Sequence, residues 1–238
     1  MAQKTILQIV QALTAEVGLP IPTGIVSSQD PNLLKLLALV RAQCDDLLAD
    51  FDWQTLQTRS NFSTASGTPS YSFPTDIKRF IGGSFYDQNN RWAMTGPMTP
   101  IEWEQVQVSG LATSPFTRFR VYDDQIWLYP TPGATVYTFV FEYISNNYVS
   151  TAGGVLQPDF TQDSDICRFD HRVVIYGTKL KFLASLNLDT TAAAQDYIAV
   201  LASAKGSNVP PRPLSITGGG TGTPLISVLN IPDTGFGT

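Results

Sequence analysis

The spacing of apolar residues changes twice along the chain, and this limits the folds that the chain can adopt. Residues 5–17 and 31–51 place apolar side chains three or four positions apart, as one face of a helix requires. Between about residues 54 and 149 the spacing is two, which is typical of strands, and from residue 165 the helical spacing returns. This order predicts an α+β protein in which a β-rich part is inserted between two pairs of helices.

We expect the four helices to pack together, because each has a single apolar stripe to bury. The predicted fold is therefore a four-helix bundle with an inserted antiparallel β-rich domain and an extended C-terminal arm. The expected boundaries are 1–53 for the first half of the bundle, 54–162 for the inserted domain, 163–206 for the second half and 207–238 for the arm.

Capping residues indicate where the helices begin. Asp30 followed by Pro31 opens the second helix, since Asp is favoured at the N-cap and Pro at the first helical position. Ser164 is expected to cap the third helix, over residues 165–187, and Asp189 to cap the last one. These signals predict long helices on both sides of the β-rich part.

The most regular strand, residues 136–144, alternates aromatic and aliphatic side chains. Its aromatic face carries Tyr137, Phe139, Phe141 and Tyr143. Such a row is typical of the core face of a sheet that another sheet or helix covers. An exposed platform on which sugar rings or bases stack is the alternative. The β-rich part is also expected to contain a short helix at residues 99–110.

The chain is acidic, and its sequence indicates neither a membrane-spanning segment nor a surface that binds nucleic acid. The net charge is −5 and the pI is near 4.7, and the densest basic piece holds only Arg118 and Arg120. No apolar run approaches the ~18 residues of a transmembrane helix. Polar residues interrupt the first helix at helical spacing, so no signal peptide is expected. Cys44 and Cys167, each in an apolar pattern, are expected to be buried and reduced.

The sequence contains none of the common catalytic, cofactor-binding or metal-binding motifs, and we therefore predict no catalytic residue, no cofactor and no metal site. The sequence lacks the GxSxG, phosphate-loop, HExxH, CxxC and Rossmann patterns. His171 stands between Asp170 and Arg172, but adjacent helical residues do not face one another. A surface or intersubunit histidine is therefore preferred over a general base. Glu142, on the aliphatic face of its strand, is most simply a solvated or arginine-paired carboxylate.

Two segments are candidate contact surfaces. The C-terminal arm is rich in Gly and Pro and holds one apolar island, which suits an extended segment that docks in a groove or on a sheet edge. Its candidate docking residues are Pro210, Pro211, Leu225, Ile226, Val228, Leu229 and Ile231. The hairpin at residues 87–96 is a candidate contact loop, unless it is an ordinary hairpin with one packed Trp. Its contact residues would be Asn89, Asn90, Arg91, Trp92 and Met94.

Several blocks, taken in order, resemble one known family. They are "FDWQTLQTRSNFST" at the helix-to-sheet junction, "PSYSFPTDIKRF", "RVYDDQIWLYPTPGATVYTFVFEYIS" and the helical pair "DHRVVIYGTKLKFLASLNLDTTAAAQDYIAVLASA". Over about residues 30–206 the chain resembles the head-to-tail adaptor proteins of tailed bacteriophages, which are also called tail tubular protein A in short-tailed phages. The order and spacing of the blocks carry this resemblance, since no single block is specific.

The resemblance implies a structural virion protein at the head–tail junction, made in the host bacterial cytoplasm, and not an enzyme. Such adaptors form a dodecameric ring beneath the portal protein ring, where they continue the DNA channel. The helical part and the C-terminal arm would grip the portal, and the β-rich domain, with its contact loop, would present a surface to the tail nozzle or next tail protein. The implied partners are therefore the portal, neighbouring copies, the tail protein and genomic DNA that passes without sequence-specific binding, with no membrane.

Two other functions are alternatives at this point. Some adaptors of this family are similar to peptidoglycan hydrolases, and a muramidase-like activity here would depend on carboxylates such as Glu142. Glycosidases need a pair of carboxyl groups, and the sequence offers no evident partner for Glu142. A different tail completion or stopper protein is the second alternative, although stoppers are usually smaller and mostly β.

Overall fold

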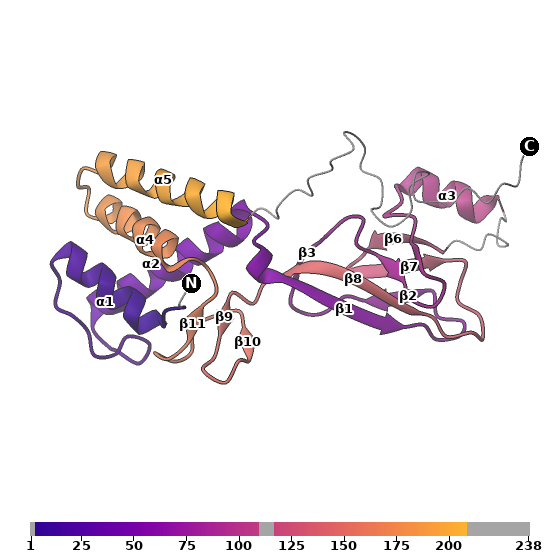
Figure 1. Ribbon diagram of the computed structural model, residues 1–238, viewed down its shortest axis with the longest axis horizontal. Coiled ribbons are helices and arrows are strands. Elements are labelled where there is room, and N and C mark those ends of the chain that lie inside the picture. Colours follow the sequence, from indigo (N-terminus) through magenta and orange to yellow (C-terminus); the bar gives the residue numbers. More distant parts are fainter. Residues whose placement is uncertain (1–2, 110–116, 209–238) are drawn as a thin grey trace, which may run out of the picture. The chain divides into compact units, whose positions relative to one another are not determined.

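The computed structural model describes residues 3–109 and 117–208 (Figure 1). The described residues form five α-helices and a short 3₁₀ helix, η1 (Gln54–Leu56). The α-helices are α1 (Ile6–Val17), α2 (Pro31–Asp50), α3 (Pro100–Val108), α4 (His171–Ser185) and α5 (Thr191–Asn208). None of these described helices combines the length and the apolar character that crossing a bilayer requires.

The strands of the described residues form three antiparallel sheets. The largest has the order β1–β8–β4–β5, with β3 also paired to β8; its strands are β1 (Gln57–Ser63), β3 (Ile77–Phe80), β4 (Tyr86–Asp87), β5 (Trp92–Ala93) and β8 (Thr138–Ser145). The second, β2–β7–β6, contains β2 (Ser70–Ser72), β6 (Arg118–Tyr122) and β7 (Gln125–Tyr129). The smallest, β10–β9–β11, contains β9 (Val149–Ser150), β10 (Leu156–Gln157) and β11 (Ile166–Cys167).

The two larger sheets share an aromatic core. Phe139, Phe141 and Tyr143 of β8 are buried in it together with Phe119, Ile126 and Leu128 of the second sheet. Many of its rings meet edge to face, among them Phe85 and Phe119, whose ring centroids lie 4.5 Å apart. The prediction that the aromatic face of this strand is a core face is confirmed, and these three rings are not an exposed stacking platform.

The prediction of a four-helix bundle is wrong. Helix α4 contacts α1, α2 and α5, but the smallest sheet completes the same core. Val149 of β9 and Cys167 of β11 are buried in that core, and Ile6 N–H donates to the Asp165 carbonyl at 2.8 Å. The apolar stripes are therefore buried against both helices and strands, so the molecule is an α+β fold rich in β-structure with a separate helical region.

The ends of the helices explain part of this difference. Asp30 accepts a hydrogen bond from Asn32 N–H at 2.9 Å and Pro31 is the first residue of α2, as predicted. Helix α4, however, begins after Asp170 and not after Ser164. Residues 166–167 instead pair with β9 as strand β11, so the helix is shorter than its apolar pattern indicated.

Both cysteines lie in the interior, as predicted. Cys44 of α2 and Cys167 of β11 are free thiols with at most 2% of their surface exposed. The hydrogen bond between the Cys44 thiol and Cys167 is the largest influence that raises the pKa of Cys44 well above its usual value, followed by burial. Cys44 is therefore held as an uncharged thiol that packs as a small apolar residue.

Candidate interaction pocket

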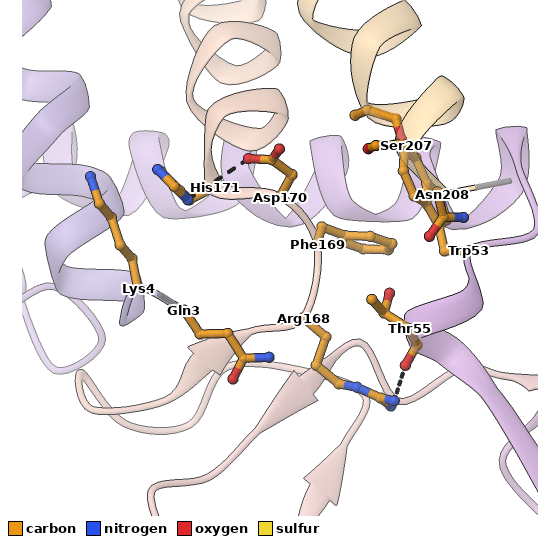
Figure 2. A pocket seen from close by; sticks show the side chains of 11 residues that line it. Gln3, Lys4, Trp53, Thr55, Arg168, Phe169, Asp170, His171, Ser207 and Asn208 are labelled. Atoms are coloured by element: carbon orange, nitrogen blue, oxygen red, sulfur yellow. Dashed lines mark hydrogen bonds and ion pairs between the residues drawn. The ribbon is translucent and has the colours of Figure 1, made fainter. Parts of the chain in front are cut away.

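A pocket of about 270 Å³ lies where the start of α1, η1, the segment before α4 and the end of α5 meet (Figure 2). We call it the Arg168 pocket. It is lined by Gln3, Lys4, Trp53, Thr55, Arg168, Phe169, Asp170, His171, Ala204, Ser207 and Asn208. Segments far apart in the sequence therefore supply its walls, and their positions depend on the helical core beneath them.

Arg168 is the central polar residue of the pocket. Its guanidinium donates from Nη1 to the Asn147 carbonyl at 2.9 Å and from Nη2 to the Thr55 carbonyl, the second of which Figure 2 draws. Burial lowers the pKa of Arg168 from its usual value, but the group stays charged at neutral pH. No carboxylate of the described residues forms an ion pair with it. Its positive charge is therefore held in place without being neutralised.

Lys4 adds a second positive charge to the lining. No hydrogen bond or ion pair joins its ammonium group to another residue in the described part of the chain. Burial, followed by the charge of Lys4, lowers the pKa of His171 below its usual value, so the imidazole is neutral at pH 7. At neutral pH the cationic groups of the lining are therefore Lys4 and Arg168.

Asp170 is the acidic residue of the lining, and the start of α4 engages it. Its carboxylate accepts a hydrogen bond from Arg172 N–H at 2.9 Å, which caps the helix, and lies 3.4 Å from Arg172 Nη2. It also lies 3.8 Å from His171 Nδ1, too far for a hydrogen bond that would orient a catalytic base. The general-base geometry considered for His171 is therefore absent from this pocket.

Two aromatic rings and Ala204 form the apolar part of the lining. Trp53 and Phe169 meet edge to face with 5.7 Å between ring centroids, and both side chains are almost fully buried. Trp53 Nε1–H donates to the Leu47 carbonyl at 2.7 Å, which fixes the indole against the end of α2. The fixed cation Arg168 and the Lys4 ammonium group, beside aromatic carbon, suit a carboxylate or other anion attached to an apolar group, which is a binding chemistry. No group of three or more metal-ligating side chains occurs among the described residues.

The chain matches the SU10 adaptor protein family over residues 4–215. It belongs to this family of bacteriophage adaptors. The match includes Lys4, the whole described fold beyond it and every other residue of the Arg168 pocket except Gln3. A comparison with curated proteins found no match. The predicted resemblance is thereby confirmed at the level of a phage adaptor family, whereas the likeness to tail tubular protein A in particular stays a prediction.

Membership of an adaptor family indicates a structural rather than an enzymatic role. Glu142, the carboxylate considered for a hydrolase, lies half-buried in β8, directly opposite Arg59 of β1. Its carboxylate accepts a hydrogen bond from Gln57 Nε2 of the same neighbouring strand. In this adaptor Glu142 therefore takes part in pairing across the sheet.

The predicted contact residues of the adaptor occupy different environments. Asn89, Asn90 and Arg91 are exposed in the turn between β4 and β5, where Asp87 accepts hydrogen bonds from the first two backbone N–H groups. Trp92 is half-buried in β5, and Met94 is buried in the aromatic core. The role of this loop as a contact surface stays a prediction. The candidate docking residues of the arm, from Pro210 to Ile231, lie outside the described residues.

The Arg168 pocket itself does not follow from the sequence. The helical spacing assigns Arg168 to a helix, and nothing in that spacing connects it with Lys4 or Thr55. The recognisable signal is indirect, since an Arg between buried Cys167 and Phe169 must either emerge at the surface or bind backbone carbonyls. Only the fold shows which of these occurs.

Proposed function

We propose that this chain is the head-to-tail adaptor of a tailed bacteriophage. Its copies form a ring, a dodecamer by the family resemblance, that docks on the portal, continues the DNA channel and provides the attachment surface for the tail. The observation that carries the proposal is the family match over residues 4–215, which spans the helical region and all three sheets. The working location is the virion, at the head–tail junction.

Contacts between the helical region and the sheets support a structural role, in which the chain keeps its interfaces at fixed positions. Arg79 of β3 forms an ion pair with Asp52 just after α2, and Arg168 joins the segment before α4 to the Thr55 carbonyl. Within the sheet region, Asp76 accepts hydrogen bonds from Tyr143 Oη at 2.9 Å and Ser145 Oγ at 2.6 Å. Repeated cross-links of this kind favour a rigid body, which an adaptor needs to keep its interfaces at a fixed spacing.

The charge of the chain also suits a DNA channel. A ring repeats the net charge of −5 in every copy, so its total is strongly negative. A channel wall of that sign repels phosphates and lets DNA pass without adhering to it. The proposed contact with DNA is therefore transient and without sequence specificity.

Mass photometry of the full chain, alone and with the portal ring of the same genome, tests this proposal. We expect the chain to add about twelve copies to each portal ring, the number that the family resemblance implies. A variant that lacks residues 209–238 keeps α5 whole and should fold but no longer bind portal, as expected if the arm docks there. A full chain that ignores portal at micromolar concentration contradicts the adaptor role, and a truncated chain that assembles normally contradicts only the role of the arm.

A further inference from the structure

We propose that the Arg168 pocket of one copy receives the tip of the β6–β7 hairpin of a neighbouring copy, Tyr122–Asp124. The two surfaces would then form a repeating contact between subunits, in which the partner copy supplies the carboxylates that the pocket lacks. This inference rests on the adaptor ring proposed above and names the residues that hold its copies together.

The hairpin tip presents two carboxylates and one aromatic ring on a short, well-defined turn. Strands β6 and β7 pair up to Tyr122 and Gln125, so only Asp123 and Asp124 form the turn. Neither aspartate has a hydrogen bond or ion pair with another described residue, and Tyr122 is 58% exposed. Arg120 lies over the Tyr122 ring, 5.2 Å from its centroid, which supports the ring from one side.

The backbone conformation of this turn is one that few residues other than glycine adopt easily, yet the chain has two aspartates there. Asp123 and Asp124 have φ angles of 54° and 52°, the left-handed region that a type I′ hairpin turn requires at both positions. Glycine is the residue that adopts this region most easily, and Asn-Gly or Asp-Gly is the usual choice. Asp is tolerated in this region as well, but two adjacent carboxylates repel one another. Because neither has a described partner, both charges are available to cations of another molecule.

The pocket and the tip complement each other in charge and in chemistry. The pocket offers Lys4 and Arg168 without a carboxylate partner, while Asp170 is engaged by Arg172. The tip offers Asp123 and Asp124, and no described cation forms an ion pair with either of them. Aromatic carbon is present on both sides, from Trp53 and Phe169 in the pocket and from Tyr122 on the tip. Charge-assisted hydrogen bonds from a guanidinium to a carboxylate are the strongest of their class.

Because the pocket and the tip are different surfaces of one chain, their contact is heterologous. Heterologous contacts repeat from copy to copy, and they generate a closed ring when the rotation between copies closes. This pairing therefore accounts for a ring without requiring a symmetric patch.

Charge reversal tests the contact in the full chain. Lys4→Glu and the double variant Asp123→Lys/Asp124→Lys should each weaken assembly on the portal ring by about tenfold or more in the concentration needed, because like charges then face one another. Combining all three substitutions sets a carboxylate at position 4 against the lysines of the reversed tip, while Arg168 still opposes them, so assembly should recover only in part but should exceed that of the Asp123→Lys/Asp124→Lys variant. Lys78→Glu is the matched control, since Lys78 is exposed in β3 and lies outside the pocket lining.

Several outcomes separate this inference from the adaptor role itself. Wild-type chain that assembles on portal while both reversed variants assemble equally well overturns the pairing and leaves the adaptor role intact. Wild-type chain that does not assemble on portal overturns both. A second measurement places Cys at positions 4 and 123 and looks for disulfide-linked chains on portal-bound rings; linked dimers and higher species support the contact, and their absence in assembled rings contradicts it.

Discussion

Replacement of Gly177 by alanine tests how α2, α4 and α5 fit together. Gly177 is buried in α4, and a Cβ atom at this position would overlap the side-chain amide of Gln43 from α2. Gln43 is 2% exposed, and its Nε2 donates to Tyr197 Oη of α5 at 2.9 Å. The added methyl group must therefore displace the amide and break the hydrogen bond that joins α2 to α5.

The expected loss of stability follows from three contributions. Overpacking a buried site costs about 1–3 kcal/mol, and leaving a buried amide without its partner costs about 1–3 kcal/mol. Alanine recovers about 1 kcal/mol through its better helix propensity. We therefore expect Gly177→Ala to lower the free energy of unfolding by about 1–5 kcal/mol, with a fall in Tm of about 2–4 °C for each kcal/mol.

Urea and thermal unfolding followed by far-ultraviolet circular dichroism measures this effect. Gly206→Ala in α5 is the control, because a Cβ atom there meets nothing within 4 Å. In a Gln43→Ala background the same Gly177→Ala change meets no amide, so its cost should fall by at least about 1 kcal/mol. A Gly177→Ala chain as stable as the wild type would refute the argument that this glycine is required by the close approach of Gln43.

Three further predictions concern buried or half-buried polar groups of the helical region. Burial opposes the charge of Asp165, but hydrogen bonds to its Oδ2 lower the pKa of this carboxyl. The stabilisation that it provides is therefore present above about pH 4 and is lost as pH falls through the folded pKa. Asp165→Asn should lose less stability in acid when urea unfolding is measured against pH, and pH profiles identical to those of the wild type would contradict this. Asp163 accepts from two backbone N–H groups of the α1–α2 loop at 3.0 and 2.8 Å, so Asp163→Ala should cost about 1–3 kcal/mol, compared with exposed Asp196→Ala as a control. Cys44 and Cys167 should react with iodoacetamide only after denaturation, as mass spectrometry can show; rapid labelling of the native chain would contradict their burial.

The sequence predicts those elements whose signals are local. Asp30 and Pro31 begin α2 because capping and a fixed proline φ act within one turn, whatever the rest of the chain does. The aromatic row of β8 is assigned to a core face because apolar rings on alternate residues of a strand all point to the same side of the sheet. In both cases the deciding interaction lies within the segment that carries the pattern.

The prediction fails where a segment is so short that its apolar residues fit both the helical spacing and the alternation of a strand. Ile166, Phe169 and Val173 follow a helical spacing, which indicates one helix from residue 165. In the fold, Ile166 and Cys167 pair with β9, and Asp170 caps α4 instead. A two-residue strand is fixed by a partner that lies 16 or 18 positions earlier in the chain, and no local pattern reports such a partner. The same sheet replaces part of the bundle that the helical stripes alone would form.

The Arg168 pocket shows a related limit for function. Most cations of this acidic chain that form ion pairs do so across elements of the helical region, as Lys181 does with Asp46 and Lys205 with Asp50. Lys4 and Arg168 have positive charges that no described carboxylate neutralises, although the chain holds more acidic than basic residues. An unpaired charge is invisible in a sequence, because pairing is a property of the fold. A charge that the fold leaves without a described partner is a place where a second molecule can supply one, and this is the physical reason to look for subunit contacts among unsatisfied groups and not among motifs.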